Sequence, residues 1–278
     1  MNRVLAAVLC LGFLGLTGCN QLGLAFRWAD TYIASKVDDY FDISSKQSAS
    51  LKDGLKKDLK DLKSDLIPQW VARFRSIQSE MKTGNLNPER TQFYFDLFMK
   101  DIEHINGRFS DTANVFISNT QNDQLEYFAK AFQKKTREDF ERFQKTTQYR
   151  KDMREKYLEY FEMFLGSLNK DQQALIDAHL TEAPFPGELK ARNKAHIISL
   201  YLQGNKTAEA RRQFLKQYYN DPTALNLPEY QNAYQNYQNQ LKKLVIEVMV
   251  TLTEQQKRNL IESLNEKTAQ LERIANAG

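Results

Sequence analysis

The side chains that most often bind metals or transfer protons are sparse in this 278-residue chain, whose histidines are His104, His179 and His196. None of them has a second His or a Cys at a spacing typical of metal sites. Asp101 and His104 are three residues apart, as are His179 and Glu182, so a helix would place each pair on one face. One histidine and one carboxylate do not make a metal site. We therefore predict no bound metal, and histidines that are solvated or cap helices.

Motifs that carry recognisable chemistry are also missing. The sequence contains no GxxxxGKS/T phosphate-binding loop, no GxGxxG, no GxSxG and no HExxH. A hydrolase that uses two carboxylates has no such signature, because Asp and Glu occur throughout the chain. Catalytic groups favour loops on a rigid scaffold, and the helical pattern leaves few loops. We expect a protein that is not an enzyme and has no evident small-molecule substrate. A hydrolase of cell-wall or lipid material is the less favoured alternative.

The N-terminus indicates export. Arg3 is followed by an uninterrupted apolar run over residues 4–16, which is too short to span a bilayer but right for a secretory signal. The run ends in the tetrapeptide Leu16-Thr17-Gly18-Cys19. This tetrapeptide resembles the lipobox of bacterial lipoproteins, in which small residues let the signal peptidase reach the bond before a cysteine that carries diacylglycerol.

The lipobox resemblance implies that residues 1–18 are a signal peptide and residues 19–26 a lipid anchor with its tether. Cys19 would carry diacylglycerol and an N-acyl chain such as palmitate, which is the one covalent group expected. Two or three acyl chains hold stably at about 0.8 kcal/mol per buried CH₂, so the protein would be anchored to the membrane without spanning it. Asn20 stands where an Asp would favour the inner membrane, so we expect the outer membrane, facing the periplasm. The alternative is an ordinary signal peptide with an incidental cysteine.

The rest of the chain predicts helix almost everywhere. Leucines between Leu51 and Leu66 recur at spacings of three and four, as on one face of an amphipathic helix. Residues 124–166 form a long charged amphipathic run, and a further stripe runs from Tyr230 to Val248. No segment shows convincing β alternation. The predicted fold is all-α, an extended bundle of long amphipathic helices.

Turn-forming residues set the expected divisions. The segment 181–187 contains two prolines and is the best boundary between an N-terminal lobe, residues 27–182, and a C-terminal lobe, residues 183–278. The alternative is that the C-terminal lobe continues the N-terminal one as a single domain. Pro68 falls inside a helical pattern, so we expect a kink or break near Leu66.

Three predicted helix starts share a motif in which an aliphatic residue precedes a small polar residue and a Gln follows three positions later. In such a capping box, the polar side chain accepts a backbone N–H of the first turn, while the Gln reaches back to the cap's own N–H. Two looser copies have Asn87 before Arg90, and Gln121 before Gln124. The three close copies are Ser44 with Gln47, Asn169 with Gln172, and Thr253 with Gln256.

These copies resemble the LTxxQ motif of the Spy-like periplasmic chaperones, which Leu252 to Gln256 matches in full. Those chaperones are about half this size. Over nearly the whole mature chain, the sequence resembles an uncharacterised family of helical bacterial lipoproteins. The shared features are the lipobox, a short aromatic helix from Arg27, several capped helices and a final Leu-Thr-x-x-Gln helix. The resemblance implies a fold and an envelope location, and it implies no established activity.

The charge pattern adds little to this. Lys and Arg number 39 against 35 Asp and Glu, a formal charge of +4, which is too balanced for a dedicated nucleic-acid binder. The segment Lys134 to Lys156 is more basic, and its simplest interpretation is the solvated face of a long helix. The chaperone resemblance would make it a surface for unfolded clients. We therefore expect a protein-binding or chaperone-like envelope factor; the alternative is an assembly factor with one fixed partner.

Overall fold

The computed structural model describes residues 21–204 and 207–276. The predicted signal peptide, the lipobox residues Leu16, Thr17 and Gly18, and Cys19 lie outside these ranges. Within them the chain is helical with short connections and no strand, which confirms the all-α prediction. The helices are α2 (Gln21–Phe41), α3 (Ser45–Thr83), α4 (Pro88–Arg108), α5 (Ser110–Ser118), α6 (Asn122–Gln144), α7 (Thr146–Leu165), α8 (Lys170–Glu182), α9 (Gly187–Gly204), α10 (Ala208–Asn220), α11 (Pro228–Val250) and α12 (Glu254–Asn276).

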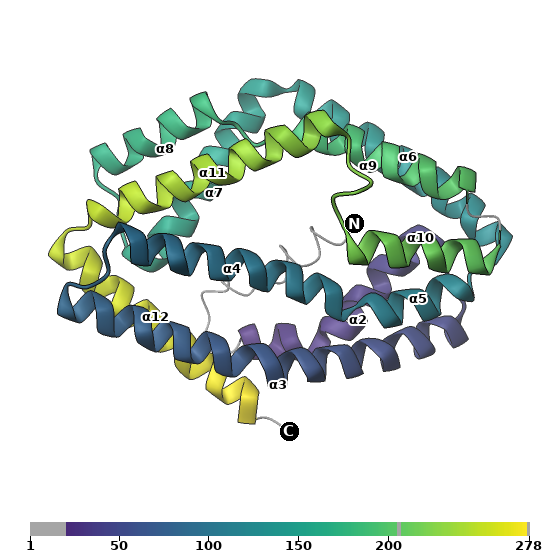
Figure 1. Cartoon of the computed structure of the whole chain (residues 1–278), viewed down its shortest axis with the longest axis horizontal. Coiled ribbons are helices and arrows are strands. Elements are labelled where there is room, and N and C mark those ends of the chain that lie inside the picture. The colour runs from purple at the N-terminus through teal and green to yellow at the C-terminus, as the bar shows by residue number, and fades with distance from the viewer. Residues whose placement is uncertain (1–20, 205–206, 277–278) are drawn as a thin grey trace.

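The helices form an elongated oval when viewed down the shortest axis (Figure 1). The long helix α3 runs along one side with α12, and α6, α8, α9 and α11 lie along the other. Helix α4 packs against α11, and α5 against α10. Helix α2 packs against both α3 and α6, so it joins the two sides near one end of the oval.

Three apolar clusters hold this arrangement together. The first, here called the main core, combines buried side chains of α3, α4, α7, α8, α11 and α12, and so includes residues of both predicted lobes. A second joins α2 to the first half of α3 and the end of α4. The third, here called the aromatic cluster, has five buried members: Phe41, Ile117, Phe128, Phe132 and Tyr201.

Helix α3 shows why an amphipathic pattern can outweigh a proline. The predicted leucine stripe from Leu51 to Leu66 is buried throughout. The helix runs from Ser45 to Thr83 without a break, with Pro68 inside it, so no break occurs near Leu66. Pro68 itself is exposed, whereas Ile67 and Val71 beside it are buried. Packing on both sides of the proline offsets the one lost backbone hydrogen bond.

The charged run 124–166 contains two helices, α6 and α7, which are separated at Lys145. The expectation of one long helix through Lys134 to Lys156 is therefore wrong. The rings of Phe143 and Tyr149 meet edge to face at 5.1 Å across the break. A Cβ on Gly187 would lie 2.2 Å from the Phe143 ring, so this glycine lets the ring lie against the start of α9. The contact between Phe143 and Gly187, 44 residues apart, has no counterpart in the local pattern.

Candidate functional site

The three close copies of the capping motif each make both hydrogen bonds of a capping box. The Ser44 Oγ accepts the Gln47 N–H at 3.3 Å, and the Gln47 Oε1 accepts the Ser44 N–H at 3.0 Å. At the start of α8, Asn169 and Gln172 exchange the same bonds at 2.9 and 3.1 Å. Thr253 and Gln256 do so at 3.2 and 3.0 Å, at the start of α12.

The structure also pairs these glutamines across the fold. The Gln172 and Gln256 amides, 84 residues apart, each donate to the other's Oε1, at 3.0 and 2.8 Å. Each remaining N–H donates to a backbone carbonyl just before the partner helix, Thr251 at 3.2 Å and Ser167 at 3.0 Å. Every donor and acceptor of both side chains is thus used.

A second pair repeats this geometry. Gln47 and Gln124, 77 residues apart, exchange hydrogen bonds at 2.9 Å each, and their other N–H groups donate to Asn119 and Asp42 carbonyls at 3.2 Å. Gln124 belongs to the looser copy, where its Oε1 accepts the Gln121 N–H at 3.0 Å. A Glu could cap each helix equally well, but an ionised carboxylate has no donor for such a pair. The need for a donor explains why these motifs carry Gln.

The remaining looser copy uses different chemistry. Asn87 caps α4 by accepting the Arg90 N–H at 2.9 Å. The Arg90 side chain, which stands in the glutamine position, donates to both carboxylate oxygens of Glu80 at 3.0 and 2.6 Å. It also lies 3.0 Å from the Tyr94 hydroxyl. This cap is tied to α3 by an ion pair and has no amide partner.

The histidines lie apart from one another. His179 is buried, and its Nε2 lies 3.1 Å from the Tyr157 hydroxyl, which in turn lies 2.7 Å from that of Tyr237. Burial lowers the pKa of His179. His179 is therefore not solvated, contrary to our expectation; it belongs to a buried polar cluster. His104 is exposed, as expected, with the Arg108 Nε at 3.2 Å.

Asp101 and Glu182, the carboxylates that the sequence places near histidines, form no site with them. Asp101 is buried and accepts hydrogen bonds from the Trp70 indole at 2.7 Å and from the Arg73 guanidinium. Glu182 is exposed at the end of α8. In the described part of the chain no three His, Cys, Asp or Glu side chains come close enough to hold a metal ion.

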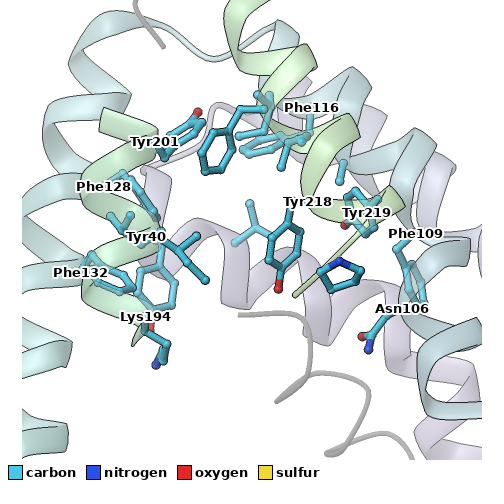
Figure 2. A pocket seen from close by; sticks show the side chains of 18 of the residues that line it. Tyr40, Asn106, Phe109, Phe116, Phe128, Phe132, Lys194, Tyr201, Tyr218 and Tyr219 are labelled. Carbon is cyan, nitrogen blue, oxygen red and sulfur yellow. The ribbon is translucent and has the colours of Figure 1, made fainter. Parts of the chain in front are cut away.

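A cavity of about 250 Å³ lies among α2, α3, α5, α6, α9 and α10 (Figure 2). The Phe41 and Phe128 rings stack at 4.6 Å, and Phe116 and Tyr201 approach them edge to face at 5.2 and 6.0 Å. Most of the lining is aliphatic or aromatic, and its phenylalanines are Phe41, Phe109, Phe116, Phe128, Phe132 and Phe214.

The nitrogen-bearing side chains labelled in Figure 2 lie on one side of this cavity. Figure 2 shows the Lys194 amino group, the Asn106 amide and the Tyr218 hydroxyl on one side, and Phe116 and Tyr201 on the opposite side. Lys36 and Lys190 also belong to the lining. The cavity is therefore amphipathic, with an apolar interior and a polar, lysine-containing mouth.

Two lysines at the mouth are paired with carboxylates that lie outside the cavity. Lys36 donates to Asp39 at 2.7 Å, and Lys194 to Asp139 at 3.2 Å, but neither carboxylate belongs to the lining. The hydrogen bond to Asp39 raises the pKa of Lys36, and burial raises the pKa of Tyr40 between them. At neutral pH the lysine is charged and the phenol is neutral, so neither acts as a base. The described lining residues include no Asp, Glu, His or Cys, and this composition suits binding better than acid–base catalysis.

Sequence reasoning missed this cavity. Its residues come from helices spread between Ile33 and Tyr230, and each stripe of aromatic side chains resembles an ordinary buried face. No residue of the basic segment Lys134 to Lys156 lines it. Part of that segment's charge is paired instead, for example between Arg154 and Asp177 at 2.6 Å. The number of phenylalanines and tyrosines on helices that already had apolar stripes could have indicated a cavity lined by aromatic rings.

The fold and the cavity define an all-α protein with a mainly apolar cavity between its helices. The chain belongs to DUF6279, a family of unknown function, which matches residues 39–231. This match includes most of the helices around the cavity and ends before α12 with its Leu-Thr-x-x-Gln motif. No curated protein and no solved structure matches the chain. None of the described helices is both long and apolar enough to cross a membrane.

Proposed function

We propose that this protein is a membrane-anchored, non-enzymatic binding protein of the bacterial envelope, which takes an apolar chain into the aromatic cavity. The observation that carries the proposal is the cavity itself, apolar within and edged with lysines at its mouth. Its volume exceeds that of a cavity of about 150 Å³ that binds benzene. The lipobox resemblance supports attachment through Cys19 and an outer-membrane location facing the periplasm.

An acyl chain fits this cavity better than a polypeptide does. A polypeptide brings backbone N–H and C=O groups, and each one left unpaired in an apolar site costs about 1–3 kcal/mol. The interior around Phe41, Phe116 and Phe128 offers aromatic rings and aliphatic side chains to a ligand. A hydrocarbon chain needs no hydrogen bonds there. Its polar end would lie at the mouth, near Lys36 and Lys194.

A second candidate is the chaperone-like or partner-binding role inferred from the LTxxQ resemblance. It is favoured by large apolar side chains that are exposed and do not line the cavity, among them Phe93, Val115 and Tyr127. Such a role would use these exposed groups to hold a polypeptide. The two candidates therefore place the ligand on different parts of the molecule.

The fluorescent probe 1-anilinonaphthalene-8-sulfonate, which has an apolar ring system and an anionic group, distinguishes them. We expect the purified protein to bind the probe and palmitate to displace it. Ala113→Phe, which fills the cavity from α5, should abolish binding, and Ala174→Phe at an exposed site of α8 is the matched control. Displacement by an unfolded, carboxymethylated protein, equally in both variants, would favour the chaperone-like role. Probe binding unaffected by Ala113→Phe would contradict the cavity proposal.

The membrane attachment has its own test. Mass spectrometry of the N-terminal peptide, from protein purified out of membranes, should show diacylglycerol and an acyl chain on Cys19. An unmodified cysteine, or a chain cleaved elsewhere, would contradict the lipoprotein prediction and leave the cavity test unaffected.

A further inference from the structure

Helix α2 exposes two large aromatic side chains on one face. Trp28 is 60% and Tyr32 is 52% solvent-exposed, and their spacing of four residues places them side by side on the helix. Lys36 continues the stripe one turn later, with its amino group 5.8 Å from the Tyr32 ring. No other described helix exposes both a Trp and a Tyr.

The opposite face of α2 is buried. Ala29, Ile33 and Ala34 pack in the cluster that joins α2 to α3. The helix is therefore fixed to the body of the protein, and its aromatic stripe is presented outward on a rigid support. Exposing a tryptophan on such a support is unusual in a protein surrounded by water, because large rings gain most from burial.

A bilayer surface fits this stripe. Trp and Tyr gather where lipid head groups meet hydrocarbon, and Lys extends its amino group toward the head groups from there. Helix α2 begins at Gln21, two residues after the predicted lipid-bearing Cys19. Trp28 is seven residues further on, about 10 Å along the helix. A helix lying flat beside the anchor would bring this side chain to the membrane without any extension of the chain.

The position of Lys36 relates this face to the cavity. Lys36 belongs to the stripe, and it also lines the cavity together with Val37 and Tyr40 of the same helix. A bilayer in contact with Trp28 and Tyr32 would therefore lie next to the polar mouth of the cavity. An acyl chain could then pass between membrane and cavity over a short distance.

We propose that α2 lies flat on the bilayer surface through Trp28, Tyr32 and Lys36, and thereby places the mouth of the cavity at the lipid head groups. The occupant of this face is the membrane to which the protein is anchored. The proposal rests on the predicted anchor at Cys19 and is independent of what the cavity binds.

The chain's two tryptophans make the test direct. Trp70 is half-buried and donates to Asp101, so it reports on the interior, whereas Trp28 reports on the proposed face. The lipid-modified full-length protein is incorporated into phosphatidylcholine and phosphatidylglycerol vesicles, with and without bromine on the upper acyl chain. We expect brominated lipid to quench tryptophan emission in the unchanged protein. Trp28→Phe should lose that quenching.

Two further variants separate docking from simple proximity. Tyr32→Ser should weaken the quenching of Trp28 because it removes half of the aromatic stripe. Tyr127→Ser, at a similarly exposed tyrosine of α6, should leave the quenching unchanged. Flotation with the vesicles measures, independently of quenching, whether the lipid anchor holds the protein on the membrane. The proposal is overturned if Trp28→Phe is quenched as strongly as the unchanged protein, if neither is quenched, or if the protein does not float with the vesicles.

Discussion

The two glutamine pairs make the same hydrogen bonds in different surroundings. Gln172 and Gln256 are buried next to the main core, whose side chains fill the space between α3, α8, α11 and α12. In the other pair, Gln47 is half-buried and Gln124 donates to the Asp42 carbonyl, next to Phe41 of the aromatic cluster. One capping device thus ties helix starts together at both places. What differs is the packing nearby: side chains fill the main core, whereas the aromatic cluster borders the cavity.

The largest expected effect follows from the burial of the first pair. Gln172→Glu should lower the free energy of unfolding by about 3 kcal/mol at neutral pH, because a buried carboxylate would face the Gln256 Oε1 without a donor. Gln47→Glu should lower it by about 1 kcal/mol, since water can reach that side chain. Urea unfolding followed by circular dichroism measures both. Equal losses would show that the two pairs are equally buried in solution.

Enlarging a side chain should change stability differently in the main core and in the cavity lining. Val248→Leu, in the main core, should cost about 1–2 kcal/mol through overpacking. Ala113→Leu, in the cavity lining, should leave stability unchanged or raise it by about 0.8 kcal/mol per CH₂ buried. Thermal unfolding of each variant is the measurement. A destabilised Ala113→Leu would mean that side chains close the cavity in solution.

The smallest effect concerns pH. Burial lowers the pKa of His179 below its ordinary value of 6.5. As pH falls through that value the unfolded chain takes up a proton before the folded protein does, so folding stability is lost. His179→Gln should remove this part of the decline between pH 7 and 5, an effect below about 1 kcal/mol. Urea unfolding at each pH tests it, with His104→Gln at an exposed site as the control. An unchanged slope in His179→Gln would indicate that the ring is solvated.

Local features were predictable from sequence because their physics is local. The leucine stripe of α3 and the cap of α4 at Asn87 depend on residues within a few positions of one another. The break at Lys145 and the continuity of α3 through Pro68 were not predictable in this way. Near both positions lie contacts between residues far apart in the sequence, such as the ring of Phe143 against Gly187 of α9.

The candidate site divides in the same manner. Each Gln of the capping motif was identified from its own helix start, but its partner was not, because 77 or 84 residues separate the members of each pair. The cavity was missed altogether. An aromatic stripe such as that of α6 has the same pattern whether its rings meet one another or border an open space.

Sequence alone determined that this chain is helical, where many of its helices begin, and which glutamines cap them, because these depend on hydrogen bonds and spacing within a turn or two. Its first residues also predicted the lipid anchor at Cys19. Only the tertiary structure decided which glutamines pair, where a buried histidine meets two tyrosines, and where packing leaves a hollow. Those outcomes depend on how whole helices fit against one another, and helix faces of similar pattern can pack tightly or stand apart.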